Sequence, residues 1–410
     1  MLRQMTIAAV GTALMTFGAT EALQAASLTV LAGGLDSPRG LTFGPDNTLY
    51  VTEAGRGGTE PFTQIRGQEF FYGATSSVTR IENGIAEKVA TGLPSYALAD
   101  GSEATGAHDI AFDAAGNAFV TLGWGGGSPS QRDLLNTPDF GNLIVIDRFD
   151  GGASWTQVAD LVAFEGINNP DGGEIDSNPF HFLIQENTAF IADPAANALL
   201  QVGLDTGEIE VKSVFEPRFV PNPFGGPNIP MQSVPTSVAV GADGAFYVGE
   251  LTGFPFPQDA ARIYRINGNE PEVYTDGFTN IIDSAVDPDG NLYVLEYATN
   301  SILSGDPTGA LSRVAPDGTR TKIVSEGLIS PTALALGIDG AIYVSNNGNA
   351  RGAGQVLRIE QTTPIPEPSS VLGMLAFGAL GAGSVLKKKG SASDYCGIGR
   401  NITPNPRSRC

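Results

Sequence analysis

Cysteine is almost absent from this chain of 410 residues, and the only two, Cys396 and Cys410, lie close to the C-terminus. The rest of the chain therefore needs no disulfide and offers no thiolate to a metal ion. Histidine is equally scarce, since His108 and His181 are the only two. Helical periodicity is also nearly missing. Short runs of Val, Ile, Leu and Tyr, separated by Gly, Asp, Asn and Pro, indicate an all-β fold instead.

Basic residues are few as well. The chain has 23 Lys and Arg against 44 Asp and Glu, which gives a formal net charge of −21. Residues 364–410 hold six of the basic residues and only two of the acidic ones, so the body of the protein is more acidic than the whole chain. Such a surface repels nucleic acid and anionic lipid, and it favours cations, neutral sugars or aromatic small molecules as partners.

The two ends of the chain carry the only long apolar runs. Residues 1–26 combine Arg3, an apolar run and small residues before Ser27, a pattern that predicts a secretory signal peptide. Near the other end, Pro-Glu-Pro at 366–368 precedes the apolar run 371–386 and three lysines. This order predicts a sorting and anchor segment at 362–389 with a single hydrophobic helix, short for a membrane span, and then a disordered tail at 390–410.

The body, residues 27–361, contains one unit that can be stacked on itself six times. Each unit is a strand, a tight Asp/Asn/Gly turn and a second strand that ends in an aromatic residue followed by aliphatic ones. The units occupy residues 37–53, 106–122, 178–193, 234–250, 280–296 and 330–346. Two more strands follow most units. Four strands per repeat at this spacing predict a six-bladed β-propeller.

The sixth unit is incomplete, because only "GQVLRIEQ" follows it before the chain becomes proline-rich. The segment "SLTVLAGGLDSP" at 27–38 is similar to "TKIVSEGLISP" at 321–331, which follows one strand and leads into another. We therefore expect the N-terminal strand to complete the sixth blade. Closing the ring in this way removes a sheet edge that would otherwise promote aggregation.

Antiparallel pairing brings the start of the first strand and the end of the second strand of each unit to the same rim of the ring. Both histidines of the chain fall at strand starts on this rim. The candidate catalytic residues are His108, Asp109 and Arg39. The candidate ligand-binding residues of the rim are Arg39, His108, Trp124, His181 and Asp283.

Four of the six strand ends on this rim are carboxylates, namely Glu53, Asp193, Glu250 and Glu296. In one interpretation they accept backbone hydrogen bonds from loops or from the neighbouring blade. In the other they line a mouth of the channel, where their mutual repulsion favours a bound cation; calcium is the candidate because carboxylate oxygens suit a hard cation. Aromatic residues on the long Gly/Pro-rich connections leave a similar choice, between a shallow ligand site and side chains that pin the loops to the ring.

The repeat P-x-G-(apolar)…D-G-x-L-Y-V-x-E resembles the NHL repeat. From "LAGGLDSPRGLTFGPDNTLYVTEAGRGG" to "GQVLRIE" the chain is similar to the ScyD/ScyE family of cyanobacterial scytonemin gene clusters. The resemblance implies an exported propeller linked to making, moving or organising an indole-phenol pigment. The segment that begins with Pro-Glu-Pro resembles the PEP-CTERM sorting signal, which implies processing by an exosortase-type membrane protease.

The resulting hypothesis is a binding or scaffold protein of the periplasm, cell surface or extracellular matrix, transiently anchored by its C-terminal helix. We expect a monomer that binds an aromatic small molecule or a polysaccharide and no nucleic acid. A non-catalytic role is favoured because the sequence shows no set of nucleophile, base and orienting group.

Two enzymatic alternatives stay open. "SPRGLTFGPDNTLYVTE" also resembles the first blade of soluble, quinone-dependent aldose dehydrogenases, which would make His108 the base beside Asp109 and Arg39. The scarcity of basic residues that could hold a tri-carboxylate quinone counts against this alternative. A metal-dependent lactonase similar to the regucalcin-type propellers would use the four strand-end carboxylates.

Overall fold

The structure, a computed structural model, describes residues 26–361 except residues 66 and 153. The predicted signal peptide, apart from Ala26, lies outside the described residues. So do the predicted sorting segment at 362–389, with its hydrophobic helix, and the tail at 390–410. In the part of the chain that the structure describes, no helix is both long and apolar enough to cross a membrane.

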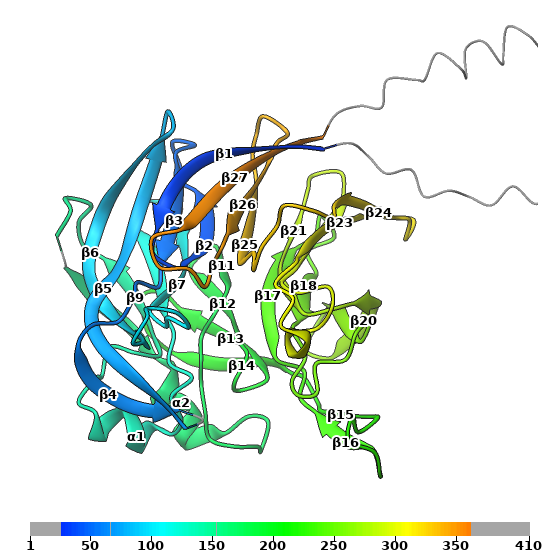
Figure 1. Ribbon diagram of the computed structural model, residues 1–410, viewed down its shortest axis with the longest axis horizontal. Coiled ribbons are helices and arrows are strands. Elements are labelled where there is room, and N and C mark those ends of the chain that lie inside the picture. Colours follow the sequence, from blue (N-terminus) through cyan, green and yellow to red (C-terminus); the bar gives the residue numbers. More distant parts are fainter. Residues whose placement is uncertain (1–25, 66, 153, 362–410) are drawn as a thin grey trace, which may run out of the picture. The chain divides into compact units, whose positions relative to one another are not determined.

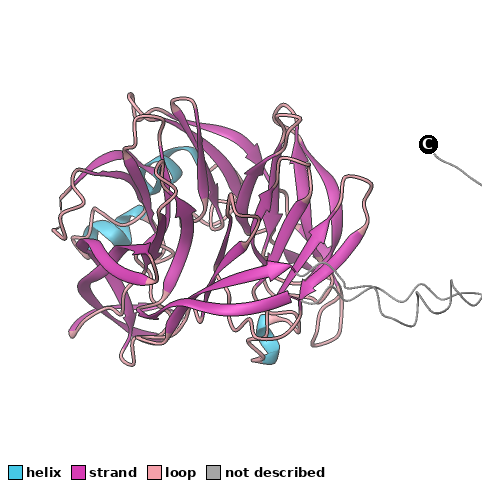
Figure 2. Cartoon of the chain, turned by 90° about the horizontal axis from the view of Figure 1, so that it is seen from above, coloured by secondary structure: helices cyan, strands magenta, loops and turns pink. Residues whose placement is uncertain are grey.

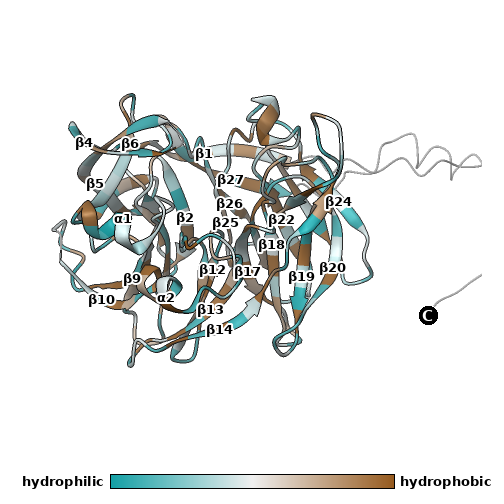
Figure 3. Cartoon of the chain, turned by 90° about the horizontal axis from the view of Figure 1, so that it is seen from below, coloured by the Kyte–Doolittle hydropathy of each residue, from teal (hydrophilic) through white to brown (hydrophobic). Residues whose placement is uncertain are grey.

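Strands dominate the described residues, and six sheets that follow one another along the chain form a six-bladed β-propeller (Figures 1 and 2). This all-β architecture confirms the prediction from the repeats. Figure 3 shows hydrophilic and hydrophobic residues mixed along β19 of the fourth blade, in which Arg262 and Arg265 are half-buried and the other four residues are buried.

The blades are built from consecutive strands. Blade 1 contains β2 (Pro38–Phe43), β3 (Leu49–Glu53), β4 (Glu60–Ile65), β5 (Gln68–Glu82) and β6 (Ile85–Leu98). Blade 2 contains β7 (Ala107–Phe112), β8 (Ala118–Leu122), β9 (Asn142–Ile146) and β10 (Trp155–Asp160). Blade 3 contains β11 (Phe182–Gln185), β12 (Thr188–Asp193), β13 (Ala198–Gly203) and β14 (Ile209–Val214).

The other three blades repeat this order. Blade 4 contains β17 (Pro235–Val240), β18 (Phe246–Glu250), β19 (Ala261–Ile266) and β20 (Pro271–Phe278). Blade 5 contains β21 (Ile281–Val286), β22 (Leu292–Glu296), β23 (Ala310–Val314) and β24 (Arg320–Val324). Blade 6 contains β25 (Ala333–Leu336), β26 (Ile342–Asn346), β27 (Gly354–Gln361) and the N-terminal strand β1 (Ala26–Leu35).

The N-terminal strand closes the ring as predicted. β1 runs antiparallel to β27 along its whole length, from Ala26 opposite Gln361 to Leu35 opposite Gly354 (Figure 1). A second link joins the same two ends of the ring, because the hydroxyl of Thr332 donates a hydrogen bond of 2.8 Å to the carbonyl of Pro38. The first and last blades are therefore connected twice: next to their inner strands, β2 and β25, and through β1, the outer strand of blade 6.

Three connections that the sequence indicates as loops contain regular structure. β4 and the first part of β5 form a ribbon, from Glu60 opposite Tyr72 to Ile65 opposite Gln68, and β15 (Arg218–Val220) pairs with β16 (Ile229–Met231). The third contains the short helix α1 (Pro129–Leu134). Two further connections contain α2 (Leu161–Asn168), after β10, and η1 (Ile302–Ser304). The glycines of the first connection serve close packing: a Cβ on Gly73 would lie 2.5 Å from the carbonyl oxygen of Gly57.

Candidate functional site

The first strand of each blade leads from the connections between blades to a hairpin turn. We call the end of the ring that carries these connections the loop side, and the end that carries the hairpin turns, such as residues 44–48 and 113–117, the turn side. A β-bulge interrupts the start of β2 between Pro38 and Leu41, and another interrupts β7 between Ala107 and Asp109. Arg39 and His108 lie in these bulges, on the loop side. Bulges change the direction of a side chain next to a site, and the sequence alone did not reveal them.

Two glycines make room for the polar residues of this region. A Cβ on Gly40 would lie 2.1 Å from Oδ1 of Asp109, and a Cβ on Gly123 would lie 1.9 Å from Cε1 of His108. Neither gap can hold a carbon atom. Asp109 and His108 can therefore occupy these positions only because the neighbouring residues have no side chain.

Three of the predicted residues meet inside the ring, where we call them the channel triad: Asp109 of β7, His181 just before β11 and Asp283 of β21. Nε2 of His181 lies 3.3 Å from Oδ1 of Asp283 and 3.7 Å from Oδ2 of Asp109. Each carboxylate is also held by the backbone, since Asp109 accepts from the N–H of Phe182 and Asp283 accepts from the N–H of Leu334. The triad thus ties together blades 2, 3, 5 and 6.

A cavity of about 420 Å³ leads to the channel triad, and its lining residues, among them Asp109 and His181, come from the first strands of all six blades. The other lining residues are mostly aliphatic or aromatic on the strand segments that run toward the hairpin turns, for example Leu41, Ile110 and Val286. This cavity therefore extends from the turn side into the ring and ends at the channel triad.

The environment of the channel triad favours its protonated forms. Burial raises the pKa of Asp109 to about 6, even though His181 opposes this shift, and burial likewise raises the pKa of Asp283. Burial also disfavours the imidazolium of His181, but the charges of Asp283 and Asp109 together raise the pKa of this histidine. Because Nδ1 accepts a hydrogen bond from the N–H of Val238, the neutral ring carries its proton on Nε2, which faces both carboxylates.

We expect the channel triad to make the protein more stable at pH 5 than at pH 8. All three folded-state pKa values lie above the unfolded ones, so the folded state binds more protons, and stability falls as the pH rises through the folded values. The effect should be about 1–3 kcal/mol, since one pKa unit corresponds to about 1.4 kcal/mol. Urea unfolding at three pH values measures it. The D109N variant should show a flatter profile, because it removes one raised carboxyl group and part of the negative charge that raises the pKa of His181, and an equal slope in both proteins would contradict this role.

His108 lies apart from the channel triad. Its Nδ1 donates a hydrogen bond of 3.0 Å to the carbonyl of Pro179, which leaves Nε2 as an acceptor. Burial, with a smaller contribution from the charge of Arg39, lowers the pKa of His108 to about 3, so the ring is neutral. Asp109 binds the backbone of β11 and faces His181, so it does not orient His108. The candidate catalytic group His108, Asp109 and Arg39 is thus not brought together as a base with its orienting carboxylate.

Arg39 is a cation without an ionic partner. Nη2 donates a hydrogen bond of 2.9 Å to the carbonyl of Ala104, whereas the buried Nε has no hydrogen-bond partner. No Asp or Glu of the described residues forms a salt bridge with this guanidinium. Burial lowers the pKa of Arg39, and the only opposing influence comes from Tyr297, which follows β22.

A cavity of about 450 Å³ on the loop side, called the loop-side cavity below, lies beside these residues. Glu103 and Thr105 line it and flank Ala104, the partner of Arg39, and Asn178 lines it next to Pro179, the partner of His108. The complete lining is Ile65, Phe70, Tyr96, Glu103, Thr105, Gly125, Glu174, Asp176, Asn178, Pro194, Ala195, Gln232 and Val234. Its three acidic residues were not singled out in the sequence, although the run "NPDGGEID" at 169–176 is a visible signal.

Trp124 lies in a buried aromatic cluster. Its indole N–H donates a hydrogen bond of 2.6 Å to the carbonyl of Gly127, and its side chain is fully buried against Phe62, Tyr96 and Phe140. The cluster joins the β4–β5 ribbon to the connection that carries α1. For these aromatic residues the structure therefore supports the pinning interpretation, and Trp124 does not line the loop-side cavity.

The strand-end carboxylates use their oxygens to bind donors of their own blade or of the connection next to it. Glu53 accepts from the N–H of Asp36, and Glu296 accepts from the N–H of Thr279, at 2.7 Å in each case. Asn346 accepts in the same way, from the N–H of Ile329. In all three blades the donor precedes the acceptor by 17 residues, so this bond is a repeated element of the fold.

The remaining two strand-end carboxylates are bound as well. Asp193 accepts from the hydroxyl of Ser177 and the N–H of Asn178, and Glu250 accepts from the hydroxyl of Ser233 and from Arg218. Within residues 26–361, as far as they are described, no three His, Cys, Asp or Glu side chains are arranged to hold a metal ion. The geometry agrees with the interpretation in which strand-end carboxylates accept hydrogen bonds from their surroundings.

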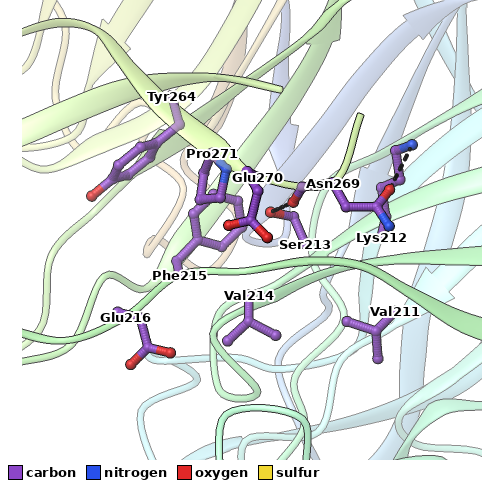
Figure 4. Close-up of a pocket in the computed structure, with 10 residues that line it drawn as sticks. All are labelled: Val211, Lys212, Ser213, Val214, Phe215, Glu216, Tyr264, Asn269, Glu270 and Pro271. Carbon is purple, nitrogen blue, oxygen red and sulfur yellow. Dashed lines mark hydrogen bonds between the residues drawn. The ribbon is translucent and has the colours of Figure 1, made fainter. Parts of the chain in front are cut away.

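The cavity of about 550 Å³ shown in Figure 4 lies on the side of the ring, between β14 and the β19–β20 hairpin. Ser213 donates a hydrogen bond of 2.7 Å to the carbonyl of Asn269 across it. Its lining contains one lysine, two glutamates and apolar residues, with no pair of side chains suited to acid–base chemistry. We therefore place the candidate site on the loop side.

Comparison with known proteins supports the fold and leaves the family open. No protein-family model matches the chain, and its sequence matches no curated protein. A PQQ-bound aldose sugar dehydrogenase from Streptomyces coelicolor is 12% identical, with a TM-score of 0.50 over 82% of this chain and 99% of that chain. A gluconolactonase from Xanthomonas campestris is 10% identical, with a TM-score of 0.49 over 82% and 90% of the two chains.

A calcium-binding regucalcin from Agrobacterium tumefaciens is 14% identical, with a TM-score of 0.46 over 81% of this chain and 94% of that chain. Of these three, the aldose sugar dehydrogenase has a TM-score of 0.50, and at 12% identity its similarity shows a shared fold and nothing about the ligand.

Proposed function

We propose that this protein is a binding protein that takes a small organic acid into the loop-side cavity and holds its carboxylate at Arg39. The observation that carries the proposal is the partly buried guanidinium of Arg39, which forms no ion pair with a described residue and whose buried Nε has no hydrogen-bond partner. Burial of an unpaired charge is costly, and the chain has 44 acidic residues from which a partner could have come. A cation kept free in such an acidic protein is best explained by an anionic ligand.

The hydroxyl of Tyr297 also suits a carboxylate at this position. The phenol oxygen of Tyr297 accepts a hydrogen bond of 3.1 Å from the side-chain amide of Asn349, so its own O–H can be donated to a ligand. Tyr297 is also close enough to Arg39 to influence its pKa. Arginine and a hydroxyl donor together form short, charge-assisted hydrogen bonds with a carboxylate.

The walls of the cavity favour hydrogen-bond donors on the rest of the ligand. Glu103, Glu174 and Asp176 supply acceptor oxygens, and Phe70 and Tyr96 supply ring surface. His108 adds a neutral acceptor nitrogen next to this region. A hydroxylated acid, either a sugar acid or a phenolic acid, combines an anionic end for Arg39 with donors for these walls.

Isothermal titration of the protein with gluconate and with 4-hydroxybenzoate tests the proposal. We expect at least one of the two acids to bind, and the R39Q variant to bind it about 10- to 100-fold more weakly, the range expected for losing a charge-assisted hydrogen bond. The matched control is R148Q, which makes the same change at an exposed arginine. If neither acid shows saturable binding up to about 10 mM, or if R39Q binds like the wild type, the proposal is wrong.

The residues fit the two enzymatic alternatives less well. A tri-carboxylate quinone would meet three acidic side chains in the loop-side cavity and one arginine beside it, so the cavity does not fit this cofactor. The metal site of a lactonase would require the strand-end carboxylates to converge, whereas each of them already accepts hydrogen bonds from the connection before its blade. We derive no catalytic step from either group.

The proposal includes export. The terminal segments support secretion, processing by an exosortase-type protease and a location in the periplasm or at the cell surface. A phenolic ligand would agree with the pigment role that the resemblance to the ScyD/ScyE family implies, whereas a sugar acid would point to the extracellular matrix. Mass spectrometry of the mature protein, recovered from outside the cytoplasm, tests whether both ends have been removed.

A further inference from the structure

A cavity of about 250 Å³, called the blade-5 cavity below, lies between blades 4 and 5 and combines a buried carboxylate with two cations. It shares no lining residue with the loop-side cavity. The complete lining is Asp259, Gly277, Phe278, Thr279, Glu296, Thr299, Ser312, Arg320 and Lys322. Its charged and hydroxyl groups therefore come from three neighbouring strands of blade 5 and from the connections beside them.

Blades 1 and 5 carry the same three polar positions: a glutamate that ends one strand, a hydroxyl residue in the next strand of the sheet and a lysine paired with that residue. These residues are Glu53, Thr79 and Lys88 in blade 1 and Glu296, Ser312 and Lys322 in blade 5. In blade 1 the group is closed, because Nζ of Lys88 lies 3.2 Å from Oε2 of Glu53 and the hydroxyl of Thr79 donates to Oε1. In blade 5 neither contact is formed among the described residues, and all three side chains line the cavity instead.

Glu296 keeps one oxygen available for a ligand. Its side chain is buried, and Oε1 accepts a hydrogen bond of 2.7 Å from the N–H of Thr279, whereas no described residue donates to Oε2. The hydroxyl of Ser312 is buried as well and has no hydrogen bond to a described residue. Buried polar groups need partners, and a molecule in the blade-5 cavity can supply them to both residues.

The same cavity carries positive charge. Lys322 is exposed and forms no salt bridge within the described part of the chain. The guanidinium of Arg320 lies 3.7 Å from the ring centre of Phe278 and donates to the carbonyl of Gly277, which fixes its position beside the cavity. Burial raises the pKa of Glu296, and the charges of Lys322 and Arg320 oppose this shift, so both cations act on the carboxylate.

We propose that the blade-5 cavity binds a small amino acid in its zwitterionic form. Its ammonium group donates to Oε2 of Glu296 and to the hydroxyl of Ser312, and its carboxylate pairs with Lys322 beside the charge of Arg320. Such charge-assisted hydrogen bonds are the strong ones in proteins. The ligand restores in blade 5 the neutralisation that Lys88 provides directly in blade 1.

Charge and size select this class of ligand. A simple anion would be repelled by Glu296, and a simple cation would be repelled by Lys322 and Arg320, whereas a zwitterion attracts both groups. Pockets for drug-sized ligands measure about 300–1,000 Å³, so the smaller blade-5 cavity suits a molecule with few heavy atoms. This site is independent of the acid ligand proposed at Arg39.

Calorimetric titration of the full-length protein with L-alanine and with ethylamine tests the proposal, because ethylamine is alanine without its carboxylate. We expect saturable binding of alanine and at least about tenfold weaker binding of ethylamine, as for the loss of one charge-assisted interaction. E296Q and K322Q should each weaken alanine binding at least about tenfold. The matched control is K88Q, which makes the same change at the equivalent position of blade 1 and should bind alanine like the wild type. Should E296Q fail to fold, K322Q decides, since Lys322 is exposed.

Three results would overturn the proposal. The first is the absence of saturable alanine binding up to about 10 mM, which would leave Oε2 of Glu296 to water. The second is ethylamine binding as tight as that of alanine, which would make the cavity a plain cation site. The third is alanine binding that R39Q removes and K322Q leaves intact, which would place the amino acid in the loop-side cavity.

Discussion

Deletion of the N-terminal strand β1, residues 26–35, should make the protein insoluble or lower its melting temperature by more than about 10 °C. The deletion removes every partner of β27 on its outer side, from Gln361 to Gly354. It also takes Ala32 and Leu35 out of the cluster that joins blades 6 and 1. Burial of two such side chains and eight residues of strand pairing amounts to more than about 5 kcal/mol, a large part of the stability of a typical domain.

Solubility, thermal unfolding and light scattering measure this effect. Two single substitutions in β1 distinguish the loss of packed side chains from the loss of ten residues of chain. Leu35 is 3% exposed and Leu28 is 37% exposed, so L35A should cost about 2–4 kcal/mol, whereas L28A should cost less than about 1 kcal/mol. A soluble deletion variant with the melting temperature of the wild type would show that Thr332 and the inner strands close the ring without β1.

The closing strand could be predicted because its evidence is local. The fragment at 27–38 carries the same turn and strand pattern as the end of the fifth repeat, and the sixth repeat lacks one strand. Likewise, the six hairpin units predict the six blades, since each needs only a strand, a turn residue and another strand. Such features depend on neighbours in the sequence, and they can be read without coordinates.

The site could be predicted only in part. The strand-start pattern singled out Asp109, His181 and Asp283 as candidates at the rim, and these three do meet. The same pattern grouped His108 with Asp109. A bulge lies between Ala107 and Asp109, and the two side chains have different partners. Bulges depend on how two strands pair across the sheet, so a single strand's sequence does not show them.

The acidic residues of the loop-side cavity, which the sequence did not single out, lie in the connections. Glu174 and Asp176 come from the segment after α2, a region without repeat-like pattern. Whether an acidic residue there is solvated or buried is decided by the packing of the connection on the ring. The same holds for Trp124, which the sequence places on an exposed rim and the structure buries completely.

The second large effect is expected at Glu250. This carboxylate is fully buried, and it binds both terminal nitrogens of Arg218, the hydroxyl of Ser233 and the phenol of Tyr264. The E250A variant should lose about 3–5 kcal/mol of stability, because it leaves the largely buried Arg218 without its counter-ion. Urea unfolding measures the loss.

The pair can be tested further by a double-mutant cycle. Arg218 begins β15, so the ion pair also fixes the β15–β16 hairpin to blade 4. R218M alone should cost less than E250A, since Glu250 keeps Ser233 and Tyr264 as donors, and the double variant should be more stable than the sum of both losses predicts. Limited proteolysis should cut residues 216–235 faster in E250A than in the wild type. Additive losses, or an unchanged cleavage rate, would mean that Glu250 acts on blade 4 alone and that the hairpin is held by other contacts.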